Sequence, residues 1–197
     1  MSRGHLLVAV TGASGTAYAH RLLADAVDRF DAVSLVVSRH GAEVARREVG
    51  WEVDFETPAV RGLPPGAERV RVYGPEEMTA PFASGSSAAD AMIVIPCSAG
   101  TAGRIAAGTA ESLITRAAAV MLKERRPLLL VVRETPLSLI DLRNLTTLAE
   151  AGARILPASP SFYHAPETLD DLVGFFVARV LDQLGLALAP ERRWGAE

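Results

Sequence analysis

Lys123 is the only lysine in a chain that contains nineteen arginines, and it lies in the charged run 122–127 (LKERRP). Lysine and arginine are not interchangeable where a compact ammonium must bind a phosphate or change its pKa. Arg116 lies seven residues earlier, on nearly the same face of a predicted helix and roughly 10 Å away along its axis. The two cations are candidates to share one phosphate, although basic residues at a helix end also complement its dipole.

The position of the single lysine excludes two classes of nucleotide-binding protein. A P-loop requires Gly-Lys-Ser/Thr, but Lys123 follows Leu122 and precedes Glu124. Short-chain dehydrogenases, which the segment 11–15 (TGASG) superficially suggests, need a tyrosine four residues before a lysine, and Ala119 occupies that place. A phosphate-binding role for Lys123 would therefore need another scaffold.

Composition places the chain among ordinary globular proteins. It has 197 residues, of which 49% are hydrophobic and 22% charged, with a net charge of −3, as expected of one compact domain. The arginines are scattered among 23 acidic residues, without the basic stripe that a nucleic-acid partner would require. We therefore expect no nucleic-acid partner.

The cysteine, histidine and N-terminal residues indicate whether the chain forms a disulfide, binds a metal or is exported. Cys97 excludes an internal disulfide and is expected to be a small buried hydrophobe. The histidines and carboxylates show no spacing typical of a metal site. The sequence has no signal-peptide pattern and no apolar stretch long enough to span a bilayer, so we expect a soluble cytoplasmic protein without a membrane partner.

Apolar runs of strand length alternate with helical patterns, the order typical of a parallel sheet covered by helices on both faces. Strands are predicted at 6–11, 32–38, 69–73, 91–96, 128–133 and 153–157, and helices at 16–30, 42–49, 101–107, 110–125, 139–151 and 169–186. The segment 50–68, with Trp51 and three prolines, is predicted to be irregular. The prediction is a three-layer, doubly wound α/β fold with one domain at 1–188 and a tail at 189–197.

In such a sheet, ligands bind outside the carboxyl ends of the strands. Small and polar residues gather in the loops predicted there, at 12–15 (GASG), 38–41 (SRHG), 96–101 (PCSAGT) and 133–136 (RETP). Backbone N–H groups and hydroxyls at helix starts can bind a phosphate, although each loop is also consistent with a simple capped connection. Arg133 and Glu134 point to opposite faces at a strand end, so one could hold a phosphate while the other serves as an acid or base. An ordinary surface ion pair is the alternative.

These motifs together resemble one family, the UbiX-type or Pad-type flavin prenyltransferases, formerly described as aromatic acid decarboxylases. The resemblance runs nearly end to end, and the block from Leu122 to Ser138 is its most specific part. It is carried by the segments 11–15 (TGASG), 83–87 (ASGSS), 96–101 (PCSAGT), 122–127 (LKERRP), 133–138 (RETPLS), 156–157 (LP), 162–164 (FYH) and 170–173 (DDLV). The sequence departs from the family pattern at Asp141, where histidine is common.

The resemblance implies a flavodoxin-like, Rossmann-like fold that binds reduced FMN and joins it to the prenyl group of dimethylallyl phosphate. Enzymes of this family add a fourth ring across N5 and C6 of the flavin, and the prenylated FMN passes to a separate UbiD-type decarboxylase. The resemblance also implies a large homo-oligomer, a dodecamer, with sites near subunit contacts.

The resemblance assigns roles to residues that match the family motifs. The residues that look like FMN ligands are Gly12, Ala13, Ser14, Ser38, Ser98, Ala99, Gly100, Thr101 and Arg133. Tyr163, Arg179 and Trp194 match contacts to dimethylallyl phosphate, while Ser84, Arg116, Lys123, Glu48 and Glu134 match the phosphate and acid–base environment. The cations would neutralise the departing phosphate. Glu134, with Glu48, would supply its proton if burial raises the carboxyl pKa.

Two other functions compete with this one. The first is an FMN-dependent decarboxylase of the related cysteine-decarboxylating group, whose Pro-x-Met-Asn-x-x-Met-Trp signature is missing; the segment 96–99 (PCSA) stands nearest its place. The second is a non-catalytic flavin carrier or partner subunit, for which Lys123, Arg116 and Glu134 would be unnecessary.

Overall fold

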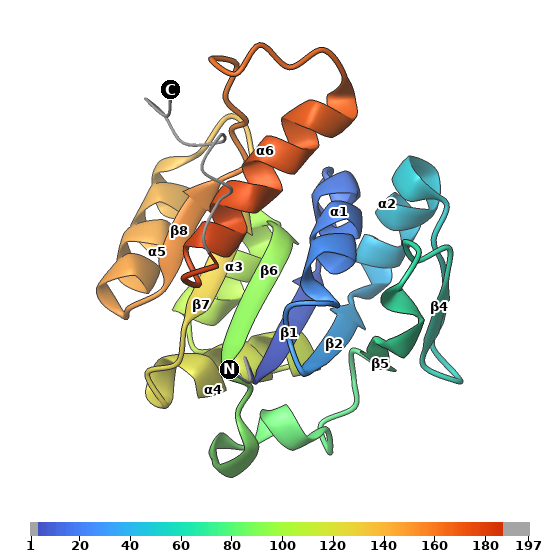
Figure 1. The fold of residues 1–197 in the computed structure, drawn as a ribbon. Coiled ribbons are helices and arrows are strands. Elements are labelled where there is room, and N and C mark those ends of the chain that lie inside the picture. The colour runs from blue at the N-terminus through green and yellow to red at the C-terminus, as the bar shows by residue number, and fades with distance from the viewer. Residues whose placement is uncertain (1–3, 187–197) are drawn as a thin grey trace.

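The predicted parallel sheet is present in the computed structural model, which describes residues 4–186 (Figure 1). Six strands lie in the order β5-β2-β1-β6-β7-β8, and every neighbouring pair is parallel. The strands are β1 (His5–Val10), β2 (Ala32–Val37), β5 (Arg71–Tyr73), β6 (Ala91–Cys97), β7 (Leu128–Val132) and β8 (Arg154–Pro157). Trp194 and the tail 189–197 lie outside the described residues.

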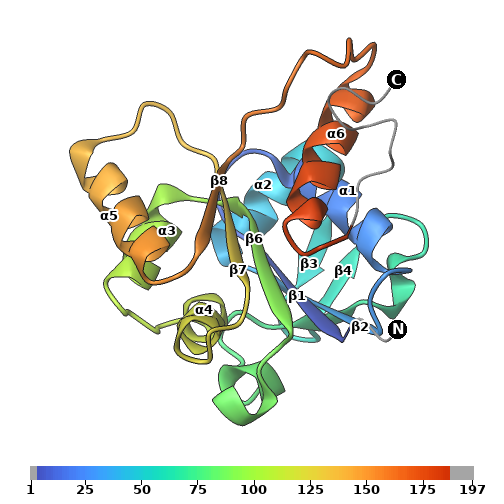
Figure 2. The same ribbon diagram turned by 60° about the vertical axis from the view of Figure 1, so that its left-hand side comes forward.

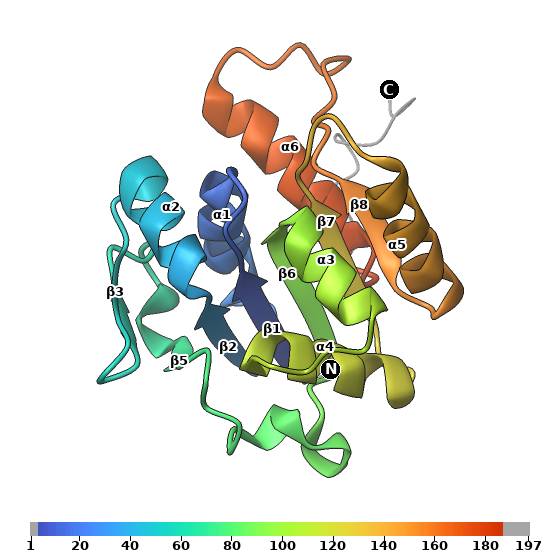
Figure 3. The same cartoon turned by 180° about the vertical axis from the view of Figure 1, so that it is seen from behind.

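Helices cover both faces of the sheet (Figures 2 and 3). They are α1 (Thr16–Ala26), α2 (Arg39–Val49), α3 (Ala99–Ala106), α4 (Leu113–Lys123), α5 (Leu139–Glu150) and α6 (Leu169–Asp182). Successive side chains of β1 point to opposite faces, so Leu6 and Val8 pack with α1, α2 and α6. Leu7 and Ala9 pack with α3, α4 and α5. The three-layer, doubly wound α/β prediction is therefore confirmed.

The prediction that 50–68 is irregular is wrong. The segment contains a two-stranded antiparallel hairpin, β3 (Glu52–Asp54) and β4 (Ala59–Arg61), followed by a 3₁₀ turn at Ala67–Arg69. Strands of three residues are too short to show the alternation that identifies a strand from sequence. Trp51, just before the hairpin, is fully buried, and its indole N–H donates to Nδ1 of His20 at 3.1 Å.

Two helices begin earlier than predicted because serine side chains cap them. Ser38 accepts from the N–H of Gly41 at 3.0 Å, and Ser98 accepts from the N–H of Thr101 at 3.3 Å. An N-cap residue satisfies a donor that the first turn leaves unpaired, so α2 and α3 begin at the residues that follow their caps, Arg39 and Ala99. The loops at the carboxyl edge are correspondingly short.

Three other expectations concern Asp141, Cys97 and the membrane. Asp141 and Ser138 form a capping box at the start of α5, with Asp141 Oδ2 2.9 Å from the N–H of Ser138. The departure from the family pattern thus supplies a helix cap. Cys97 is fully buried, which raises the pKa of its thiol to about 12. No helix within residues 4–186 is both long and apolar enough to cross a membrane.

Candidate active site

A pocket of about 420 Å³ lies at the carboxyl edge of the sheet, where the loops after β1, β2 and β6 meet. Five of the predicted FMN ligands line it together: Gly12, Ser38, Ser98, Gly100 and Thr101. They come from three separate loops that the parallel order of β2, β1 and β6 brings side by side. The sequence therefore predicted a set of residues that does converge in space.

Three helices begin at this pocket. The caps of α2 and α3, Ser38 and Ser98, line it, and so does Ser112, which caps α4 by accepting from the N–H of Thr115 at 3.3 Å. Free backbone N–H groups and the positive end of the dipole make each helix start favourable to an anion. Three such starts around one cavity suit the phosphate of a flavin nucleotide.

Close packing of the loops leaves no room for a side chain at Gly12. A Cβ added at Gly12 would lie 2.8 Å from Cβ of His40, and one added at Gly41 would lie 2.8 Å from the carbonyl oxygen of Val10. Real Cβ atoms do not approach other heavy atoms so closely. The glycines therefore let the first two loops pack together and leave the pocket open, so the residues present fit an FMN phosphate.

Several pocket residues were missed in the sequence. They are His40, Arg104, Glu111, Ser112, Ile114 and Thr115. The helix 110–125 was predicted to start before Ser112, which hid the cap, whereas α4 begins at Leu113. A serine followed three residues later by threonine, ahead of an apolar run, was the signal that could have located it.

Replacing Ser112 with alanine should weaken both the fold and FMN binding. Loss of an N-cap side chain costs about 1 kcal/mol, which lowers Tm by about 2–4 °C in a domain of this size. FMN affinity should fall because the N-terminal N–H groups of α4 lose their fixed position. Thr168→Ala, which removes the cap of α6, is the matched control: it should lower Tm similarly but leave FMN affinity, measured by fluorescence titration, unchanged. Equal FMN affinity in both variants would contradict the prediction.

The remaining predicted FMN ligands lie around the same edge. Ala13 and Ser14 form the turn between β1 and α1, and Ala99 is the first residue of α3. Arg133 follows β7, its side chain is exposed, and its N–H donates to the carbonyl of Cys97 at 3.0 Å. Glu134, next along the chain, is exposed and accepts from the N–H of Thr135 at 3.2 Å.

Glu48 behaves as an ionised cap of α1. Its carboxylate accepts from the N–H of Gly15 at 2.9 Å and from the N–H of Thr16 at 2.7 Å. Partial burial by itself raises the pKa of Glu48, but hydrogen bonds from the Ser14 side chain and from these two N–H groups outweigh it and lower the pKa. The condition for proton donation, a carboxyl pKa raised by burial, is therefore not met at Glu48, which is a poor proton donor.

The Glu48 cap should make stability depend on pH only in acid. Because the folded-state pKa is lowered, the stabilisation is present above the ordinary value of 4.5 and is lost as the pH falls through the lower folded value. Glu48→Gln should therefore have a lower Tm than the wild type at pH 7. The two Tm values should converge as the pH falls below 4.5 and the carboxylate of Glu48 takes up its proton. A Tm difference that is constant with pH would contradict this assignment.

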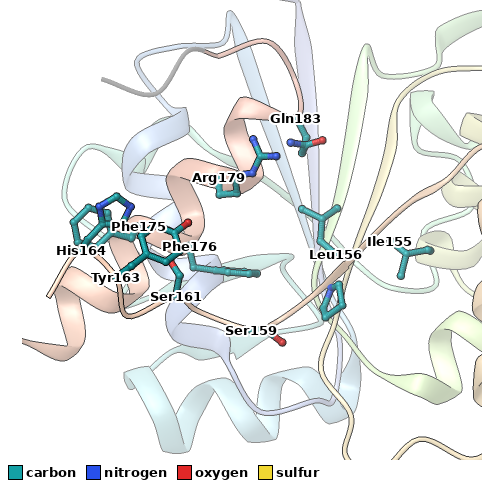
Figure 4. Close-up of a pocket in the computed structure, with 11 residues that line it drawn as sticks. Ile155, Leu156, Ser159, Ser161, Tyr163, His164, Phe175, Phe176, Arg179 and Gln183 are labelled. Atoms are coloured by element: carbon teal, nitrogen blue, oxygen red, sulfur yellow. The ribbon is translucent and has the colours of Figure 1, made fainter. Parts of the chain in front are cut away.

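A second pocket, of about 490 Å³, lies between β8 and α6. It is lined by Ile155, Leu156, Pro157, Ser159, Ser161, Tyr163, His164, Phe175, Phe176, Arg179 and Gln183 (Figure 4). The predicted substrate residues Tyr163 and Arg179 thus share a wall of aromatic and aliphatic side chains. Arg179 also forms an ion pair with Asp182 one turn along α6.

The other predicted phosphate ligands form a third group on α4. Arg116 and Lys123 are both exposed on this helix, and Nε of Arg116 donates to the carbonyl of Ala83 at 2.9 Å. Ser84, the next residue after Ala83 in the chain, is exposed as well. Lys123 Nζ lies 3.9 Å from Glu124 Oε1, an exposed contact that contributes little. The structure therefore brings Ser84, Arg116 and Lys123 to one surface.

Lys123, the last residue of α4, lies away from the predicted FMN ligands of the same chain. Lys123 ends α4 close to the amino end of β7, whereas Arg133 follows the carboxyl end of that strand. β7 has five residues and is roughly 16 Å long. A basic pocket of about 650 Å³ surrounds Lys123 and is also lined by Leu122, Arg125, Arg126, Pro127, Glu150, Ala151, Gly152 and Arg154. Lys123 and Arg133 therefore do not share one ligand within a single chain.

Comparison with known proteins identifies the family. The family model described as Flavoprotein matches residues 1–181. A flavin prenyltransferase UbiX from Pseudomonas aeruginosa is 43% identical over 197 residues, an alignment that covers 98% of this chain and 94% of the relative. Identity at this level over nearly the full length of both chains extends well beyond the individual motifs.

Two solved structures agree in fold and sequence. A dodecameric FMN-dependent UbiX-like decarboxylase from Escherichia coli O157:H7 has a TM-score of 0.86 and 40% identity, covering 96% of this chain and 98% of the other. AnUbiX (PadA1), in complex with FMN and dimethylallyl pyrophosphate, has a TM-score of 0.86 and 36% identity, with 99% of each chain covered. This chain therefore belongs to the flavoprotein family and, within it, to the UbiX-type flavin prenyltransferases.

Proposed function

We propose that this protein transfers the dimethylallyl group of dimethylallyl phosphate to N5 and C6 of reduced FMN, releasing phosphate and prenylated FMN. The observation that carries the proposal is the convergence of Gly12, Ser38, Ser98 and Thr101 on one pocket at three helix starts. The prenylated product would serve a UbiD-type decarboxylase as its cofactor.

The flavin pocket uses backbone and hydroxyl donors to bind its ligand. The N-terminal N–H groups of α2, α3 and α4 would hold the FMN phosphate, with Ser38 and Ser98 fixing those helix starts. Arg133, at the end of β7, would contact the flavin from the neighbouring loop. Reduced FMN would supply the nucleophilic positions to which the prenyl carbons are joined.

The cationic side chains act on the leaving group. Breaking the allylic C–O bond leaves its electron pair on the phosphate, and charge-assisted hydrogen bonds from Arg179, Lys123 and Arg116 would stabilise that charge. Tyr163 would donate its hydroxyl to the same phosphate. Glu134 would hold the proton that the acid–base steps require, because the Glu48 carboxylate is already committed to capping α1.

We further propose that two copies of the chain complete each site. Arg179 and Lys123 line separate pockets within one chain, yet both are assigned to the same substrate phosphate. A homo-oligomer resolves this conflict if α4 of one copy, with Ser84, Arg116 and Lys123, lies against the pocket between β8 and α6 of another. The dodecameric relative supports such an assembly.

Anaerobic incubation with reduced FMN and dimethylallyl phosphate, followed by mass analysis of the extracted flavin, tests the reaction. The expected result is a flavin heavier by one prenyl unit together with free phosphate. Dimethylallyl pyrophosphate, added in parallel, measures which leaving group is preferred. An unchanged flavin mass with both substrates would overturn the proposal, and carbon dioxide release from a peptidyl cysteine would favour the cysteine-decarboxylating alternative.

A further inference from the structure

The loop that carries Tyr163 joins β8 to α6 and spans residues 158–168. Its first residue, Ala158, donates its N–H to the carbonyl of Val132 at 2.8 Å. In the middle, the N–H of Ala165 donates to the carbonyl of Phe162 at 3.0 Å, closing a turn within the loop itself. That turn fixes the local shape of the loop but not its position over the pocket.

An aromatic stack joins this turn to α6. The ring of His164 lies parallel to the ring of Phe175, with centroids 4.5 Å apart and an interplanar angle of 15°. Tyr163 also packs on His164. Their ring centroids are 4.5 Å apart, and their ring planes meet at 55°. Figure 4 shows the three rings gathered at one end of the pocket. His164 therefore connects the loop between β8 and α6 to α6 through its ring.

The helix face that receives this stack also carries Arg179. Phe175 and Arg179 are four residues apart in α6 and so lie on the same face, one turn from each other. Both line the pocket between β8 and α6. The stack of His164 on Phe175 therefore lies one helical turn from Arg179, in the same pocket as Tyr163.

We infer that His164 is a positioning residue that holds Tyr163 beside Arg179 by stacking its ring on Phe175. The inference rests on the proposed function, in which Tyr163 and Arg179 contact the allylic phosphate. The stack requires a flat ring, so we expect phenylalanine at position 164 to keep Tyr163 in place. Asparagine keeps hydrogen-bonding capacity but has no ring, so we expect it to fail. The role is thus separable from any hydrogen bond or charge of the imidazole.

Steady-state kinetics of three variants tests the inference. His164→Ala and His164→Asn should raise KM for dimethylallyl phosphate about tenfold, equivalent to about 1.4 kcal/mol, while kcat stays within about twofold. His164→Phe should retain the wild-type KM, and FMN affinity should be unchanged in all three. Glu167→Ala, an exposed position in the same loop, is the matched control and should behave as wild type.

Amide hydrogen exchange provides a readout without substrate. Residues 162–165 should exchange faster in His164→Ala than in the wild type and at the wild-type rate in His164→Phe. Wild-type KM in His164→Ala, or rescue by asparagine but not by phenylalanine, would overturn the inference. An inactive wild-type enzyme would instead contradict the proposed function, and the exchange experiment would still decide whether His164 orders the loop.

Discussion

Replacing Lys123 with alanine should leave FMN bound but reduce its prenylation by about 10²–10³-fold, the usual cost of removing one preorganised donor from a developing anion. Phosphate gains charge as the allylic C–O bond breaks, and a compact ammonium can meet that charge. Lys123 lies outside the FMN pocket of its own chain and is assigned to the substrate phosphate, so flavin affinity should not change. Single-turnover mass analysis of the flavin and a separate FMN titration measure the two quantities.

Two companion variants give the Lys123 result its meaning. Lys123→Arg keeps the charge but presents a planar fork in place of a compact ammonium, so it should remain at least about tenfold slower than the wild type. Arg47→Ala removes an exposed cation from α2, outside the pockets described above, and should prenylate FMN at the wild-type rate. Full activity in Lys123→Ala would show that its isolation among arginines is a compositional accident.

Mixed oligomers can locate the site in which Lys123 works. Chains carrying Lys123→Ala and chains carrying Arg179→Ala should each be inactive when pure. If Lys123 serves the pocket of another copy, co-expression places an intact Lys123 beside an intact Arg179 in a fraction of the sites, and activity returns. If Lys123 acts within its own chain, each site lacks one of the two side chains, and the mixture stays inactive.

The sheet was predictable because its strands are buried on both faces. β1, β2, β6 and β7 are nearly continuous apolar runs, a pattern that solvent-facing strands rarely show. The hairpin at 52–61 was not predictable, since each of its strands has three residues and only a partly buried valine at its centre. The helix starts were misplaced where a serine cap, rather than an apolar residue, fixes the first turn.

The sequence predicted which residues belong to the candidate site better than it predicted how those residues are arranged in space. Motif resemblance picked Gly12, Ser38, Ser98 and Thr101, and the order of parallel strands brought them together. Sequence spacing placed Arg116 and Lys123 on one helix, but it does not say which edge of the sheet that helix approaches. The pKa of Glu48 was likewise out of reach, because it depends on hydrogen bonds from a loop 33 residues away in sequence.

Gly12 shows how closely the fold and the flavin pocket depend on each other. Its φ is not in the left-handed region, so an alanine there carries no conformational penalty of the kind that a positive φ imposes. The constraint is steric, because the added Cβ would lie 2.8 Å from Cβ of His40 and 3.6 Å from its carbonyl carbon. Relief requires the loops after β1 and β2 to separate, which moves the start of α2 away from the pocket.

Gly12→Ala should therefore weaken FMN binding by roughly 5- to 150-fold, the range that corresponds to the about 1–3 kcal/mol that overpacking typically costs. Gly74→Ala is the matched control, since a Cβ there would meet its nearest neighbours at 3.8 and 3.9 Å, an ordinary contact, and FMN affinity should not change. Fluorescence titration gives both affinities, and Tm separates loss of binding from loss of fold. If Gly12→Ala binds FMN as tightly as Gly74→Ala does, the close approach of these two loops does not shape the flavin pocket.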